Sequence, residues 1–289
     1  MANLKEVKQR ITSVISTQQI TKAMKMVSAA KLRRAQDKII QMRPYSQKLT
    51  AILNNVSAAS EGATDLVYAQ KREVKKVLLI PITSDKGLCG AFNSNVLKAT
   101  NLAIRAQFVG ADITVMTIGK KALEYFKKTN YARIEDYSTL FLSLSTDAIS
   151  EAANYAMDAF VAGEFDQVVL VFNEFKNVAT QFVRTEQFLP MAAVATEKVT
   201  VETDYILEPS REFIIEELVP KALRVQFLKA ILESNASEHG ARMTAMDKAT
   251  ENAGDLLKEL KLMYNRTRQA AITNEILEIV SGANALAGK

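Results

Sequence analysis

Cysteine, histidine and tryptophan are almost missing from the sequence, whose 289 residues include one cysteine, one histidine and no tryptophan. A single cysteine excludes an internal disulfide and any metal site made of several thiolates, and it suits a reducing compartment. The only histidine, His239, lies far along the chain from Cys89, so the sequence suggests no catalytic triad. The best apolar run, 77–82, falls well short of the ~18 residues of a membrane-spanning helix, and the charged N-terminus does not resemble a signal peptide. We therefore expect a soluble chain that reaches a membrane only through its partners.

Proline and glycine are scarce in both terminal segments of the chain. Residues 3–58 and 210–286 contain only two prolines, Pro44 and Pro220, so each segment predicts one very long helix. At about 1.5 Å of rise per residue, these helices would reach roughly 80 and 110 Å. Helices of that length cannot bury themselves in one globular core, and we expect them to pair with each other and project as a shaft.

Apolar residues in both terminal segments recur three and four positions apart, as in the contact seam of a coiled coil. In the first segment the seam is interrupted by polar residues between Ser16 and Lys22. Either the register shifts there, or the helix faces something other than its partner helix. The second seam is rich in small residues that allow close approach, and it comprises Met246, Ala249, Ala253, Leu256, Leu260, Met263, Thr267, Ala270, Asn274 and Leu277.

The middle of the chain alternates between strand and helix patterns. Apolar strand candidates are 77–82, 112–118 and 167–172, with 178–188 as a further strand, and helical patterns fall at 94–108, 120–128 and 146–162. Such alternation favours a parallel, Rossmann-like sheet. We therefore predict an α/β chain in which a long antiparallel two-helix coiled coil joins a Rossmann-like middle domain. The predicted divisions are a helix at 1–60, a linker at 61–75, the middle domain at 76–208 and a helix at 209–289.

Positive charge is concentrated near the N-terminus. Residues 1–43 hold ten lysines and arginines against two acids, a balance of +8, whereas the whole chain carries +5. This asymmetry indicates an acidic partner such as nucleic acid, anionic lipid or a ring of carboxylates, although a solvated helix face explains it equally well. The segment lacks aromatic residues for base stacking, which counts against a basic coiled-coil protein that binds nucleic acid.

The loop SDKGLCG at 84–90 follows the first strand of the middle domain, where α/β folds often bind phosphate. Its glycine spacing matches neither the dinucleotide fingerprint nor the Walker pattern, and a tight turn that lets a helix pack on the sheet is the favoured interpretation. Cys89 is then a small apolar filler. The alternative, a small α/β enzyme with helical arms, predicts ligand binding at this loop. No catalytic residue, cofactor or metal site is predicted.

Four stretches carry a family resemblance. ITKAMKMVSAAKL at 20–32 resembles the N-terminal signature of the ATP synthase gamma-subunit family, and SDKGLCGAFN at 84–93 is similar to its mid-chain motif. SEHGARMTAM at 237–246 and NRTRQAAITNE at 265–275 resemble its two C-terminal signatures. The four stretches occur in the family's order, and the resemblance covers essentially the whole chain. Because the only cysteine is Cys89, a redox-active cysteine pair of the plant chloroplast kind is excluded. With no transit-peptide pattern we expect a bacterial type, and a mature mitochondrial chain is the alternative.

The resemblance implies a non-catalytic rotor subunit without cofactors. Its paired helices would turn inside a ring of three alpha and three beta subunits, coupling proton flow to ATP synthesis or hydrolysis on the beta subunits. The middle domain would contact the epsilon subunit and the c-ring, peripheral to the cytoplasmic side of the cell inner membrane. By the same resemblance, the contacts with the alpha/beta stator are Met24, Lys25, Arg242, Arg268 and Gln269, and Tyr205 lies where c-ring and epsilon approach.

Overall fold

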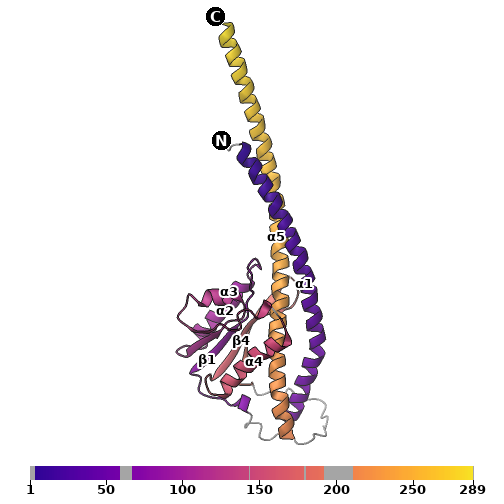
Figure 1. The fold of residues 1–289 in the computed structure, drawn as a ribbon, viewed down its shortest axis with the longest axis vertical. Coiled ribbons are helices and arrows are strands. Elements are labelled where there is room, and N and C mark those ends of the chain that lie inside the picture. Colours follow the sequence, from indigo (N-terminus) through magenta and orange to yellow (C-terminus); the bar gives the residue numbers. More distant parts are fainter. Residues whose placement is uncertain (1–3, 59–66, 143, 179, 192–210, 289) are drawn as a thin grey trace. The chain divides into compact units, whose positions relative to one another are not determined.

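The computed structural model describes residues 4–58, 67–142, 144–178, 180–191 and 211–288 (Figure 1). Within these ranges the chain forms two compact units, one of Ser28–Arg242 and one of Met1–Val27 with Met243–Lys289. The two long helices, α1 (Leu4–Ala58) and α5 (Arg211–Ala287), each contribute to both units. The predicted terminal helices are thus confirmed. The predicted domain divisions stay a prediction, and Tyr205 lies outside the described residues.

A five-stranded sheet forms the centre of the 28–242 unit, in the order β3-β2-β1-β4-β5. The strands are β1 (Lys76–Pro81), β2 (Asp112–Met116), β3 (Ala132–Ile134), β4 (Gln167–Phe175) and β5 (Gln181–Leu189). The first four run parallel, which confirms the Rossmann-like pattern, and the short strand β3 was not predicted. The fifth strand, β5, departs from the parallel pattern because it pairs antiparallel with β4. Only a short turn separates these two strands, and a parallel crossover needs a dozen or more residues.

Helices cover both faces of this sheet, which is why β1 is apolar along nearly its whole length. On one face, Val77 and Leu79 pack in a core with residues of α2 (Phe92–Ala106) and α3 (Lys120–Phe126). On the other face, Leu78 and Ile80 pack with α4 (Thr146–Val161). The helices predicted from the sequence are therefore confirmed within a few residues at each end.

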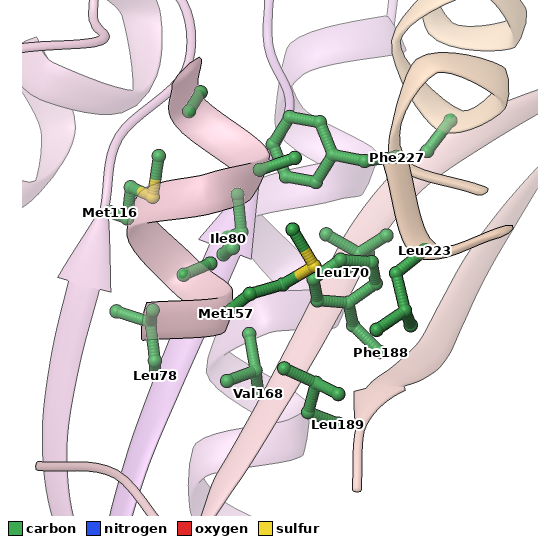
Figure 2. Packing of buried hydrophobic residues seen from close by; sticks show 14 of the residues in the cluster. Leu78, Ile80, Met116, Met157, Val168, Leu170, Phe188, Leu189, Leu223 and Phe227 are labelled. Atoms are coloured by element: carbon green, nitrogen blue, oxygen red, sulfur yellow. The ribbon is translucent and has the colours of Figure 1, made fainter. Parts of the chain in front are cut away.

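The second core also includes residues of α5. Leu223 and Phe227 of α5 are fully buried with Met157 of α4 (Figure 2). The rings of Phe227 and Phe188 lie 5.7 Å apart between centroids, in an edge-on arrangement that aromatic pairs favour. Residues in the first third of α5 thus pack in the core of the Ser28–Arg242 unit, although the pattern of the segment predicted only a shaft helix.

In the smaller unit, α1 and α5 pair in antiparallel directions. Thr250 Oγ1 lies 2.8 Å from Thr21 Oγ1, and Lys25 Nζ lies 2.6 Å from the Asp247 carboxylate, so later residues of α1 meet earlier residues of α5. Gln18 also donates a hydrogen bond to the Thr250 carbonyl at 3.5 Å. The polar interruption at 16–22 therefore places at least two of its side chains against the partner helix rather than away from it.

None of the helices in the described ranges is both long enough and apolar enough to cross a membrane.

Candidate functional site

Met24 and Lys25 lie on α1 in the smaller unit, both partly exposed. Lys25 pairs with Asp247 of α5 across the two helices at 2.6 Å, and about half of each side chain is exposed to solvent. An exposed ion pair of this kind contributes little to stability because water screens it. A carboxylate on a partner protein would therefore compete with Asp247 for Lys25 at low energetic cost.

Arg268 and Gln269 lie at the start of a fully exposed part of α5. Every residue from 268 to 284 is exposed in the structure. The predicted apolar seam continues into this stretch, where Ala270, Asn274 and Leu277 face solvent instead of another helix. Exposed isoleucines recur three to four residues apart along the same stretch, at Ile272, Ile276 and Ile279, and Val280 follows four residues after Ile276. A contiguous apolar stripe of this kind marks a surface that contacts a partner.

Arg242 has a different environment, because its side chain is buried in the 28–242 unit. Its guanidinium donates one hydrogen bond to Glu238 and two more to the carbonyls of Lys86 and Gly87, at 2.9 and 3.3 Å. Arg242 thus ties α5 to the 84–90 loop. A stator contact by Arg242 stays a prediction, and its known partners belong to its own chain.

The 84–90 loop is itself a tightly bonded turn. Ser84 exchanges hydrogen bonds with Asn93, and Asp85 accepts one from the Lys120 backbone N–H at the start of α3. Leu88 and Gly90 take left-handed backbone angles, with φ of +64° and +58°. Cys89 is 1% exposed, and its sulfur accepts a hydrogen bond from Asn93 Nδ2. The structure supports the interpretation of this loop as a turn with a buried cysteine filler.

Glu238 and His239 lie beside Arg242 and are at least as deeply buried. Burial raises the pKa of the Glu238 carboxyl, and the Arg242 guanidinium opposes that rise. The pKa of His239 is lowered to about 4, mainly by burial and also by the positive charges of Arg242 and Lys31. The sequence analysis treated His239 as weak evidence for any site, because residue spacing does not reveal burial or charged neighbours from other elements.

We expect the lowered pKa of His239 to make the free energy of unfolding depend on pH. The unfolded histidine binds a proton below about pH 6.5, whereas the folded one does so only near pH 4, so stability falls as pH falls between these values. The loss attributable to His239 is about 3 kcal/mol once the pH is below both pKa values. Urea unfolding at pH 7.5 and pH 4 gives the free energy of unfolding of the wild type and of His239→Gln, and the wild type should lose more of it at pH 4. A stability difference between the two proteins that is the same at both pH values would contradict the prediction.

Among the described residues, no group of three or more histidine, cysteine or acidic side chains is placed to hold a metal ion.

Comparison with known proteins gives one consistent family. Residues 3–286 match the family model described as ATP synthase. The chain is 56% identical to the ATP synthase gamma chain of Cytophaga hutchinsonii over 293 residues, covering 99% of each chain, and 54% identical to that of Flavobacterium psychrophilum over the full length of both. A chain in the structure of the Euglena gracilis mitochondrial ATP synthase (OSCP/F1/c-ring) matches the fold with a TM-score of 0.66, at 21% identity and over 98% and 94% of the two chains.

Proposed function

The chain belongs to the ATP synthase gamma-chain family, and we propose that it acts as the central-stalk rotor of a proton-translocating F-type ATP synthase. In this role it transmits torque between a membrane c-ring and a catalytic head of three alpha and three beta subunits. ATP synthesis and hydrolysis take place on the beta subunits, and this chain is a non-catalytic partner. It is peripheral to the cytoplasmic side of the cell inner membrane and is held there by the other subunits.

One observation carries this proposal: the C-terminal part of α5 leaves its partner helix and continues as a fully exposed helix with an apolar stripe. No other part of the described chain packs on residues 268–284. Ile272 and Ile276 are therefore about half exposed to solvent, although both are apolar. An isolated helix is marginally stable in water, and its stability normally comes from packing of an amphipathic face. A surrounding sleeve formed by other subunits would supply that packing and still let the helix turn.

The proposed stator contacts divide into two groups on the surface of the smaller unit. Arg268 and Gln269 stand at the base of the exposed stretch, where charge-assisted hydrogen bonds to a partner can form and break. Met24 and Lys25 lie on α1, where the Lys25–Asp247 pair is open to solvent and to exchange with a partner carboxylate. We also propose that Arg242, which belongs to the Ser28–Arg242 unit, contacts the head of alpha and beta subunits.

The opposite end of the rotor is proposed to contact the epsilon subunit and the c-ring. Tyr205 is the residue assigned to that contact by resemblance to the family, and the described residues neither include it nor test it.

Purification of the chain from its native membrane fraction tests the proposed assembly. We expect the alpha, beta and epsilon subunits and the c-ring to co-purify with a C-terminally tagged chain, and nuclease treatment to leave the set unchanged. A tagged chain that ends after residue 267 is the matched control, because it keeps the epsilon and c-ring surfaces and lacks the exposed stretch. It should retain epsilon and c-ring and lose most of the alpha and beta subunits. Recovery of nucleic acid without ATPase subunits would instead favour the basic coiled-coil alternative.

A further inference from the structure

A cavity of about 400 Å³ lies in the Ser28–Arg242 unit between α1, α5 and the loop after β1. The cationic side chains around it come from all three elements. They are Lys31, Arg34 and Lys38 of α1, Lys86 of the loop and Arg242 of α5. Two acids, Asp85 and Glu238, complete the charged lining, so positive groups outnumber negative ones.

Both acids already have partners that reduce their ability to neutralise the cavity. Asp85 accepts a hydrogen bond from the Lys120 N–H, and Glu238 is paired with Arg242. By contrast, the described part of the chain offers no ion pair to Lys31, Arg34 or Lys38. These three residues are spaced i, i+3 and i+7 along α1, which places them on one face of that helix. A concentrated positive potential therefore remains at the cavity.

His239 adds a polar group without a partner to the same lining. Its side chain is 9% exposed, and its Nδ1 atom is buried with no hydrogen-bond partner among the described residues. An unsatisfied buried polar atom costs about 1–3 kcal/mol, so native proteins rarely keep one without a reason. A negatively charged ligand near His239 would favour the imidazolium form, in which both ring nitrogens carry a proton and can donate a hydrogen bond.

The rest of the lining is the polar Asn235 and five apolar residues, Ala35, Phe141, Leu142, Leu144 and Leu232. Arg242 is buried, so water screens its attraction for an anion less than that of the exposed Lys31, Arg34, Lys38 and Lys86. The cavity has room for a small ion with water around it, and the 84–90 loop lacks a nucleotide-binding glycine pattern. We propose that this cavity is a binding site for a small oxyanion of the sulfate or phosphate class. The proposal is independent of the rotor function.

The only histidine of the chain serves as a reporter for this site. The full chain, prepared without an affinity tag that contains histidine, is labelled with ¹⁵N-histidine and titrated with sulfate at constant ionic strength. Sulfate keeps its charge throughout the experimental pH range, so any pH dependence belongs to the protein. We expect saturable movement of the His239 signal and a rise of its pKa from about 4, because the anion offsets the charges that face it. The charged groups that face His239 are Lys31, Arg34, Lys38, Lys86 and Arg242, with Asp85 and Glu238.

A pair of adjacent arginines provides the matched variants. Both arginines are exposed, but Arg34 lines the cavity and its neighbour Arg33 does not. We expect Arg34→Gln to weaken sulfate binding by about tenfold and Arg33→Gln to leave it within about twofold. Lys38→Gln should behave like Arg34→Gln, and thermal unfolding verifies that all three variants fold. Equal losses in Arg33→Gln and Arg34→Gln, a non-saturating drift of the His239 signal, or the same response to chloride would overturn the proposal.

Discussion

Met24→Lys is expected to leave ATP hydrolysis in native membranes near the wild-type rate and to reduce ATP-driven proton pumping by about tenfold. Met24 lies on α1 with part of its thioether exposed, next to the Lys25–Asp247 pair. A methionine forms soft, adaptable contacts that can change as a rotor turns. A lysine at the same place adds a second ammonium group that forms charge-assisted hydrogen bonds to stator carboxylates, and these bonds release slowly.

Met24→Leu is the matched control, since leucine keeps an apolar side chain of similar volume and adds no charge. It should pump at a rate close to the wild type per ATP hydrolysed. Acidification of inverted membrane vesicles and phosphate release from ATP are measured together. They give the number of protons pumped per ATP hydrolysed for each variant. A normal ratio in Met24→Lys would contradict the idea that the side chain at position 24 must stay uncharged. Loss of alpha and beta subunits from the Met24→Lys membranes would instead indicate a defect of assembly.

The features that the sequence predicted well were those governed by local periodicity. Long stretches poor in proline and glycine predicted α1 and α5, and apolar runs between helical patterns predicted three of the four parallel strands, β1, β2 and β4. These patterns are short-range, so each can be recognised without knowledge of its neighbours in space. The burial of Cys89 could also be anticipated, because a small apolar residue in a turn before a helix has few other roles.

The features that the sequence missed depend on which elements meet. The pattern of α5 shows an apolar face, yet it cannot show that Leu223 and Phe227 use that face to close the core of the sheet. The polar residues Gln18 and Thr21 looked like a gap in the seam, and in the structure they bond to Thr250. A period of three and four identifies a contact face but not the chemistry of the partner on the other side.

The candidate site shows the same limit more sharply. Arg242 was chosen by family resemblance as a donor to a stator, and the structure shows that it bonds to Glu238 and to the 84–90 loop. The four-residue spacing of Glu238 and Arg242 was visible in the sequence, and such pairs usually lie on a solvated helix surface. Burial of the pair comes from the loop that packs on it, and that loop lies more than a hundred positions earlier in the chain.

The largest stability effect is therefore expected at Arg242. Replacement by leucine leaves the buried Glu238 carboxylate without its cation and the carbonyls of Lys86 and Gly87 without their donor. Breaking a buried pair by removal of one partner costs about 3–5 kcal/mol, because the remaining charge stays in a low-dielectric site. Urea unfolding of the full chain at pH 7.5 should show this loss in Arg242→Leu. Arg266→Leu, an exposed cation on the same helix, should change the free energy of unfolding by no more than about 0.5 kcal/mol.

A second substitution separates the buried charge from the loss of the loop contacts. In the double variant Glu238→Gln with Arg242→Leu, no unpaired carboxylate remains, so much of the stability should return. The part that does not return measures the hydrogen bonds from Arg242 to the 84–90 loop, since those are absent in both variants. If the double variant were as unstable as Arg242→Leu alone, the cost would lie in the loop contacts rather than in the buried charge. If Arg242→Leu matched Arg266→Leu, then Arg242 would not fasten the loop to α5, and its role as an exposed contact with the stator would gain support.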